Sequence, residues 1–282
     1  MQFYPGLAAL APAFDGFILD LWGVIHDGVQ PYPGAIDCLR YLRDAGKPAV
    51  LLSNAPRRAA VAQAGLRAMG IPDDLYTDIM TSGEATHELL RTRSDAWFAA
   101  LGRRVYHLGP VRDRNVIEGL DLTLVENPDD ADFVLNTGPD DAGGITELGD
   151  WEAVLLRFRA NNLKMICANP DLEVMRGPLR LICAGLLTQR YEALGGEARW
   201  IGKPDPAIYA PVQAMLGIAP NRILAVGDTP RTDLAGAASV GIASCWVLGG
   251  IHADDFGHPD EAITHARAAG FRPHALLQSF SW

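Results

Sequence analysis

Short apolar runs that alternate with amphipathic stretches constrain the fold of this chain more than any other feature of its sequence. Residues 17–20 and 48–52 are two such runs, and the stretch between them, 34–45, carries apolar side chains at helical spacing. This alternation predicts βα units, in which helices cover a mainly parallel sheet. Asp20 ends the first run, and Ser53 directly follows the second. The fold class is therefore expected to be α/β, with polar groups where strands stop.

The pattern restarts in the middle of the chain and again near its end. Strands are expected at residues 104–108, 133–136, 164–167, 223–226 and 243–247, and helices at 57–69, 151–159 and 231–239, with a further helix after Thr81-Ser82. The middle elements form a set of their own between two parts of the larger pattern. We therefore expect an αβ layer that is inserted into a Rossmann-like core rather than appended to it.

Composition excludes several classes of function. The net charge of −10 argues against a nucleic-acid-binding protein, because such proteins use Lys and Arg to displace counterions from the phosphate backbone. No uncharged run approaches the roughly 20 residues of a membrane span, and the apolar amino terminus lacks the basic region of a signal peptide. We expect a cytoplasmic protein that binds neither nucleic acid nor membranes. The cysteines, which we interpret as core thiols because they form no metal-binding pair, are Cys38, Cys167, Cys183 and Cys245.

Three segments that are distant in sequence place polar side chains at strand ends. Asp20, Ser53 and Asp228 each stand at or just after the carboxyl end of an expected strand. In open α/β sheets ligands bind at the carboxyl ends of the strands, so we expect these side chains to converge. Taken alone, Asp20 fits a turn or a capping aspartate equally well.

The residue types near these strand ends suit phosphate and a hard metal ion. Ser53 and Asn54 offer a hydroxyl and an amide that can donate to phosphate oxygens, and Lys203 offers the positive charge that a phosphoryl transition state needs. Asp233 stands five residues after Asp228, close enough to share one loop and helix start. Oxygen ligands of this kind suit magnesium rather than zinc.

Four segments, FILDLWGVIHDG, LLSNAPR, GKPDP and AVGDTPRTD, occur in this order and together resemble the motifs of the haloacid dehalogenase-like superfamily. The insertion between the second and third segments is similar to that of subclass IIA, the NagD-like phosphatases of ribonucleotides, sugar phosphates and aryl phosphates. The resemblance covers nearly the whole chain, including YPGAIDCLRYL and CANPD. It implies a core at residues 1–83 and 192–282 and an αβ cap at residues 84–191, which would exclude water and select the leaving group.

The resemblance also implies a role for each matching residue of the reaction site. Asp20 would be the nucleophile that forms an aspartyl-phosphate, and Lys203 would neutralise charge on the nucleophile and on the phosphate. Ser53 would hold the phosphoryl group, with Asn54 nearby. Arg57 either contacts a substrate phosphate or begins a solvated helix. The implied substrate is a small phosphorylated metabolite, whose identity depends on the cap and not on these motifs.

A magnesium site follows from the same resemblance. Asp20, the backbone carbonyl of Trp22 and Asp228 would bind Mg²⁺, and Asp233 would act on the metal through water or on Lys203. A homodimer formed through the cap is a further expectation from the family.

Trp22 departs from the family pattern. Phosphatases of this superfamily carry an aspartate two residues after the nucleophile, which protonates the leaving oxygen and later activates water. An indole cannot exchange a proton at neutral pH, and a positioned acid–base group is worth roughly 10²–10⁴-fold in rate. Either the leaving group needs little protonation, or His26 or Asp27 replaces the acid, or the chain is a catalytically weak relative that binds a phosphorylated ligand. A dehalogenase is less consistent with the metal-binding character of Asp228.

Two further segments leave alternatives open. Asn169 and Asp171 in CANPD match a family segment that reaches from the cap towards the site, but the same residues fit an Asn-Pro turn. The His and Asp residues of the stretch 252–258 have a spacing compatible with a metal ion, although we interpret this stretch as a surface loop.

Overall fold

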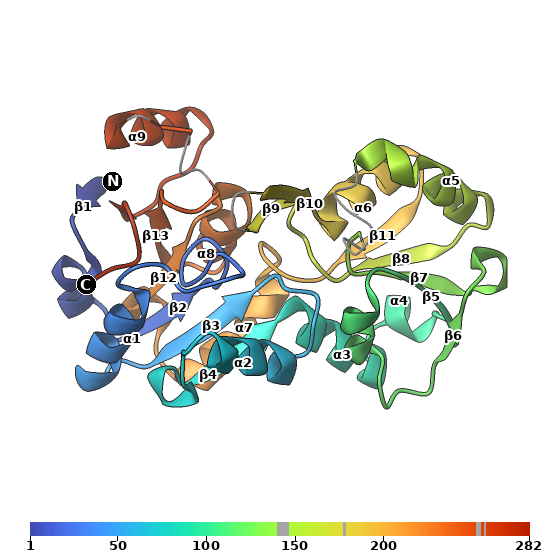
Figure 1. Cartoon of the computed structure of the whole chain (residues 1–282), viewed down its shortest axis with the longest axis horizontal. Helices are drawn as coiled ribbons and strands as arrows, with labels where there is room; N and C mark the ends of the chain where they lie inside the picture. Colours follow the sequence, from blue (N-terminus) through green and yellow to red (C-terminus); the bar gives the residue numbers. More distant parts are fainter. Residues whose placement is uncertain (140–146, 177–178, 252–254, 257) are drawn as a thin grey trace.

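The computed structural model describes residues 1–139, 147–176, 179–251, 255–256 and 258–282. Two parallel sheets, one of seven strands and one of five, form two lobes that lie side by side (Figure 1). The seven-stranded sheet is built from the beginning and the end of the chain, and the five-stranded sheet comes from the middle. This arrangement confirms the predicted α/β fold class.

The seven-stranded sheet has the strand order β1-β14-β13-β12-β2-β3-β4, and each neighbouring pair is parallel. Its strands are β1 (Gln2–Tyr4), β2 (Gly16–Leu19), β3 (Ala49–Ser53), β4 (Asp78–Thr81), β12 (Ile223–Gly227), β13 (Ala243–Val247) and β14 (Ala275–Leu277). Strands β2, β3 and β12 are buried along their whole length, as expected for parallel strands with helices on both faces.

Helices pack on both faces of this sheet, because successive side chains of a strand point to opposite faces. Phe17 and Leu19 of β2 pack with α1 (Ala35–Asp44) and α2 (Ala59–Ala68), whereas Ile18 packs with α7 (Tyr209–Leu216) and α8 (Ala235–Ser239). Farther along the sheet, Trp246 packs against α9 (Pro259–Ala268). The core is thus a three-layer sandwich that fixes the positions of the strand ends.

The five-stranded sheet has the order β11-β8-β7-β5-β6 and is also parallel throughout. Its strands are β5 (Arg104–Leu108), β6 (Thr123–Val125), β7 (Phe133–Asn136), β8 (Lys164–Cys167) and β11 (Glu197–Trp200). One face packs on α3 (Ser82–Thr92) and α4 (Ala96–Ala99), and the other on α5 (Glu152–Ala160) and α6 (Ala184–Ala193). This lobe therefore has two apolar clusters of its own.

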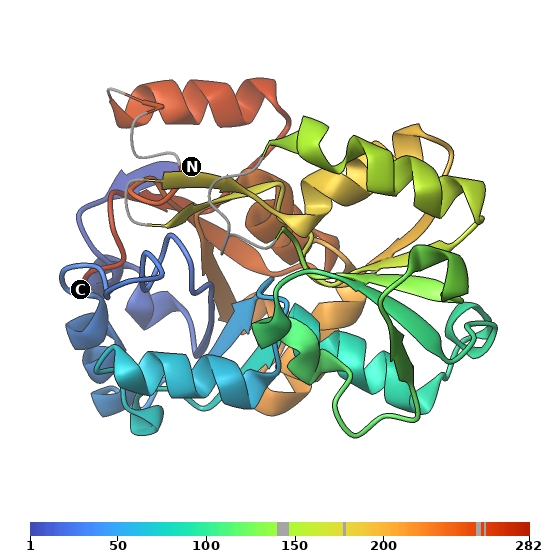
Figure 2. The ribbon, with the colours of Figure 1, turned by 45° about the vertical axis from the view of Figure 1, so that its right-hand side comes forward.

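An antiparallel hairpin extends from the five-stranded lobe over the seven-stranded lobe (Figures 1 and 2). Its strands are β9 (Glu173–Arg176) and β10 (Leu179–Ile182), and Glu173 pairs with Ile182. The apolar pattern does not predict this hairpin, because none of its described side chains is fully buried.

The strands predicted at 104–108, 133–136, 164–167 and 243–247 are confirmed residue for residue. Helix α2 begins at Ala59, two residues later than predicted, because Arg58 N and Ala59 N donate to Asn115 Oδ1 (2.7 Å) and Glu84 Oε2 (2.9 Å), which cap the helix there. The helix predicted at 231–239 is a π-helical turn, Pro230–Leu234, that leads into α8.

The end of the inserted layer was predicted at residue 191, but β11 lies beyond that residue. Glu197 to Trp200 pair with Lys164 to Cys167 of β8. We therefore propose that the inserted layer extends through Trp200.

All four cysteines are buried and free, which confirms their interpretation as core thiols. Among the helices that the structure describes, none combines the length and the apolar character needed to cross a membrane.

Candidate active site

The carboxyl ends of three adjacent strands bring the predicted site residues together. In the registers of β2 with β12 and of β2 with β3, Leu19 pairs with Val226 and with Leu51. Asp20 follows β2 directly, Asp228 follows β12, and Ser53 is the last residue of β3. The convergence expected from the sequence is therefore present at this edge of the sheet.

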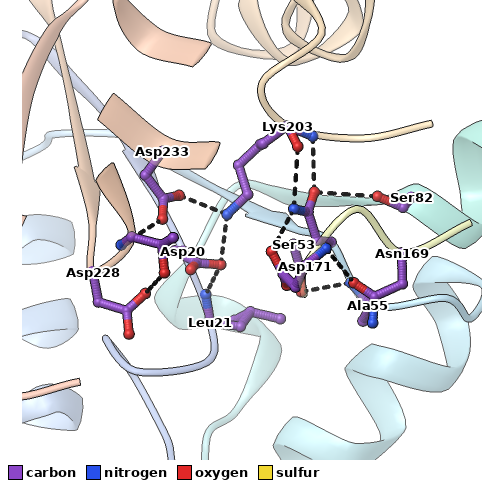
Figure 3. A network of polar contacts seen from close by, with 12 residues as sticks. Asp20, Leu21, Ser53, Ala55, Ser82, Asn169, Asp171, Lys203, Asp228 and Asp233 are labelled. Atoms are coloured by element: carbon purple, nitrogen blue, oxygen red, sulfur yellow. Dashed lines mark hydrogen bonds and ion pairs between the residues drawn. The ribbon is translucent and has the colours of Figure 1, made fainter. Parts of the chain in front are cut away.

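Lys203 is the only described cation at the centre of this cluster, and it lies between two carboxylates (Figure 3). Its Nζ is 2.8 Å from Asp20 Oδ1 and 2.7 Å from Asp233 Oδ1, and the residue is 2% exposed. Burial lowers the pKa of Lys203, but Asp20 and Asp233 outweigh burial and hold that pKa well above its usual value. Lys203 is thus a permanent positive charge beside Asp20.

Three buried carboxylates, Asp20, Asp228 and Asp233, have oxygens that all lie within 4.8 Å of one another. Burial and the neighbouring Asp233 raise the pKa of Asp20 well above its usual value and that of Asp228 to about 7. Three carboxylates and one ammonium leave a negative charge that a divalent cation would neutralise. The donors are all hard oxygens, so this residue set fits magnesium.

Local hydrogen bonds hold the two aspartates that follow β12. Asp228 Oδ2 accepts from Ile251 N (2.8 Å), and its Oδ1 accepts from Thr229 Oγ1 (3.1 Å). Asp233 Oδ2 accepts from Thr229 N (3.1 Å), while its Oδ1 contacts Lys203. Asp233 is predicted to act either on the metal through water or on Lys203, and the structure shows its contact with Lys203.

Asn54 connects the core with the inserted layer. Its Oδ1 accepts from Lys203 N (2.8 Å) and Ser82 Oγ (3.3 Å), and its Nδ2 donates to Lys203 O (3.3 Å) and Asp171 Oδ1 (2.8 Å). Asn54 was expected to lie near the phosphoryl group and offer its amide. Because both hydrogens of that amide already have acceptors, we propose that Asn54 positions Lys203 and Asp171 instead.

Ser53 and Arg57 have different surroundings. Ser53 is 1% exposed, and its Oγ accepts from Ala55 N (3.2 Å). Arg57 belongs to a cavity between the lobes, where its Nε lies 3.7 Å from Asp113 Oδ1. The structure therefore places Ser53 at the strand ends and Arg57 in the wall of a cavity that Asp20 does not line.

Two neighbouring cavities open between the lobes. The smaller, about 30 Å³, is lined by Asp20 and Asp228, and the larger, about 250 Å³, is lined by Arg57 and by residues of the inserted layer. Trp22 and Asp171 line both cavities. The smaller cavity has the functional groups for a phosphoryl group, and the larger one has room for what is attached to it.

Trp22 packs within its own loop while forming part of both cavity walls. Its ring meets that of His26 edge to face, with centroids 5.2 Å apart. Gly28 lies against the other end of the indole, since a Cβ built on Gly28 would be 2.1 Å from Trp22 Cη2. The Trp22 side chain is therefore held in place where it lines the two cavities. The carbonyl role predicted for residue 22 stays a prediction.

Neither candidate for a replacement acid in this loop is placed for that task. His26 Nδ1 accepts from Gly28 N (3.0 Å), and burial lowers the pKa of His26 to about 4, so the ring is neutral. Asp27 Oδ1 accepts from Val29 N (2.8 Å) and Gln30 N (2.7 Å) in a local turn. Both residues are absent from the described linings of the two cavities.

Asp171 is the site residue whose role the sequence left open. It is the last residue of the CANPD segment, and its contact with Asn54 shows that this segment reaches the core. The order of the motifs alone cannot reveal such a contact, because the two residues are 117 positions apart.

Within the stretch 252–258, His252 and Asp254 lie outside the described residues.

We predict that Gly28→Ala lowers the stability of the protein by about 2–3 kcal/mol, because it adds both backbone strain at φ +84° and a clash with Trp22. Gly46→Ala is the matched control, since Gly46 has φ +67° and open space around its Cβ position. The control should lose only about 1–2 kcal/mol. Urea unfolding of both variants measures the difference, and equal losses would show that Trp22 is not held by Gly28.

Known proteins are similar to this chain in sequence and in fold. A family model described as haloacid dehalogenase-like hydrolase matches residues 17–123, and one described as HAD-hydrolase-like matches residues 200–281. A crystal structure of a hydrolase of the haloacid dehalogenase-like family from Brucella suis 1330 aligns with a TM-score of 0.85 and 34% identity, covering 99% of this chain and 100% of that one.

Two relatives with named activities match over most of their length. Ribonucleotide monophosphatase NagD from Escherichia coli K12 is 28% identical over 248 residues, which cover 84% of this chain and 89% of NagD. The acid sugar phosphatase from Staphylococcus epidermidis is 24% identical over 242 residues, which cover 84% and 88% of the two chains. Together with the Brucella structure and the family models, these matches show that the chain belongs to the haloacid dehalogenase-like hydrolase family, in the NagD-like subclass that its motifs resemble.

Proposed function

We propose that this hydrolase is a magnesium-dependent phosphatase of small phosphorylated metabolites, which acts through an aspartyl-phosphate on Asp20. The observation that supports this proposal most strongly is the placement of Lys203 between Asp20 and Asp233, 2.8 Å and 2.7 Å from their oxygens, beside a third carboxylate. A phosphatase needs a nucleophile, a fixed cation and a metal site at one point, and these residues supply all three.

Asp20 is held in one orientation before any substrate binds. Its Oδ1 accepts from Leu21 N (2.7 Å) and contacts Lys203 Nζ (2.8 Å), and its backbone N donates to Val226 O (2.9 Å). A carboxylate with one oxygen fixed in this way has its other oxygen available for attack on phosphorus. Lys203 then stabilises the negative charge that develops on the phosphoryl oxygens.

Asp20, Asp228, Asp233 and the carbonyl of Trp22 are the groups that would hold the magnesium ion. When bound, the metal would neutralise charge on the phosphoryl group and help to orient it. Asp228 is oriented to hold the metal ion, because both of its oxygens accept hydrogen bonds, one from its own loop and one from the loop of Ile251.

The leaving group would occupy the larger cavity. Trp22 forms one wall, and Arg57 and Arg112 add positive charge from the core and from the inserted layer. A pocket of about 250 Å³ suits a small metabolite rather than a macromolecule. The named activities of NagD and the acid sugar phosphatase favour catalysis over the alternative of a protein that only binds a phosphorylated ligand.

The test is release of inorganic phosphate from nucleotides, sugar phosphates and aryl phosphates, measured with excess Mg²⁺ and again with EDTA. We expect turnover of at least one class that disappears with EDTA and returns when Mg²⁺ is restored. The same panel with Asp20→Asn corrects for contaminating phosphatases. Turnover that persists in EDTA would contradict the metal requirement, and equal release by the variant would contradict the whole proposal.

A further inference from the structure

The bond that a phosphatase breaks lies between the phosphoryl group and the leaving group, so a proton donor must stand where their two cavities meet. Among the described residues, those that line both cavities are Trp22, Asp171 and Val174. Asp171 alone in this set carries an ionisable side chain. Its position at the boundary is independent of the family pattern, in which the acid stands at the position of Trp22.

Asp171 is also held in a defined orientation. Its Oδ1 accepts from Asn54 Nδ2 (2.8 Å), its backbone N donates to Asn169 Oδ1 (3.1 Å), and its backbone O accepts from Gly185 N (3.1 Å). Gly185 also lies too close to this segment to carry a side chain, since a Cβ there would be 2.5 Å from Asp171 O. One carboxyl oxygen is therefore fixed by the core, and the second remains for a substrate.

We propose that Asp171, a residue of the inserted layer, is the general acid and base that replaces the missing aspartate at position 22. This inference rests on the proposed phosphatase function. Asp20 attacks phosphorus, the bond from phosphorus to the leaving oxygen breaks, and that oxygen takes its electron pair together with the proton of the Asp171 carboxyl group. Water then attacks the phosphorus of the aspartyl-phosphate and gives a proton to the Asp171 carboxylate. The bond between phosphorus and the Asp20 oxygen breaks with its electron pair on that oxygen, so phosphate leaves and both aspartates return to their starting forms.

The surroundings of Asp171 are compatible with a carboxyl group that holds a proton. Burial and, to a smaller extent, the charge of Asp233 raise its pKa above the usual value, against the opposite influence of Lys203, of the hydrogen bond from Asn54 and of Arg231. A raised pKa favours proton donation near neutral pH.

Glu173 is the rival carboxylate. It lines the smaller cavity only, and its Oε2 lies 3.2 Å from Arg180 Nη1 across the hairpin. Asp171 is therefore the better placed of the two.

The test compares Asp171→Asn with the wild type on phenyl phosphates of similar shape whose leaving groups differ in basicity. Asn keeps the acceptor for Asn54 but has no proton to give. We expect kcat/KM to fall by roughly 10²-fold or more for 4-methoxyphenyl phosphate, a poor leaving group, and by less than about tenfold for 4-nitrophenyl phosphate. Asp171→Glu, which retains a carboxyl group, should recover part of the loss on the poor leaving group.

Several outcomes would overturn the inference. An equal loss on both substrates would indicate that Asp171 only maintains the structure, and no loss on either would deny it a role. A leaving-group-dependent loss in Glu173→Gln instead would assign the acid to Glu173. If the wild type itself releases no phosphate from any phenyl phosphate or metabolite, the proposed function fails and the inference fails with it. Retained hydrolysis of 4-nitrophenyl phosphate by Asp171→Asn shows that the variant is folded.

Discussion

Asp20→Asn is expected to lower phosphate release by on the order of 10⁴–10⁶-fold, the scale of loss when a member of a nucleophilic unit is removed. An amide oxygen is a far weaker nucleophile than a carboxylate, and it forms no stable ester with phosphate. The substitution preserves size and an acceptor for Leu21 N, which now donates to Asp20 Oδ1 at 2.7 Å. Steady-state phosphate release measures the effect. Acid quenching during turnover should also trap a phosphoenzyme in the wild type that reacts with hydroxylamine.

Asp27→Asn is the matched control for this substitution. Asp27 lies seven residues farther along the same loop, and its Oδ1 accepts from Val29 N and Gln30 N, which an Asn can also satisfy. We expect its activity to stay within about threefold of the wild type, since it performs no step of the reaction. If Asp20→Asn retains more than a hundredth of the activity, or if no phosphoenzyme forms, Asp20 is not the nucleophile.

Lys203→Met is expected to lower the free energy of unfolding by about 3–5 kcal/mol in the absence of metal, because it leaves buried carboxylates without their positive partner. The Lys203 and Asp20 side chains are only 3% and 10% exposed, so solvent screens this interaction weakly. Activity should also fall sharply, since no described cation replaces the ammonium between Asp20 and Asp233. Urea unfolding at neutral pH with EDTA measures the stability, and phosphate release with Mg²⁺ measures the activity.

The control for this prediction is an ion pair of the same kind in solvent. Arg222 Nε lies 2.7 Å from Asp15 Oδ2, but the two side chains are 46% and 51% exposed. Arg222→Gln should therefore lower the stability far less than Lys203→Met does. An equally small loss in Lys203→Met would mean that the three carboxylates do not depend on Lys203, and that protons or solvent already neutralise them.

The features that the sequence predicts well are those that depend on local pattern. Buried parallel strands read as apolar runs, so β5, β7, β8 and β13 are predicted at their observed residues. The convergence of Asp20 and Asp228 is predictable as well, because the carboxyl ends of adjacent parallel strands must lie at one edge of the sheet.

The features that sequence reasoning missed depend on contacts between distant segments. The hairpin β9–β10 has partly exposed, mixed side chains, and only the pairing of its two strands defines it. Both amide hydrogens of Asn54 have acceptors more than a hundred residues away in the chain, at Asp171 and Lys203. A local motif shows that an amide is present, but it does not show which acceptors its hydrogens contact. The same is true of Trp22, whose position in the motif shows that the usual acid is missing but does not point to Asp171, the residue that we propose in its place.

The short passage from β11 to Lys203 has a consequence for how such proteins diversify. Only two residues, Ile201 and Gly202, stand between Trp200, the last residue of β11, and Lys203. Asn54 holds Lys203 through both its backbone N and its backbone O. Loops of the inserted layer that contact neither Asn54 nor Lys203 are expected to tolerate changes in length, whereas a single insertion or deletion in this passage would withdraw the ammonium from both aspartates. A chimera that receives the inserted layer of another relative must therefore keep its second junction at or before Trp200, so that Gly202 and Lys203 remain with the recipient core.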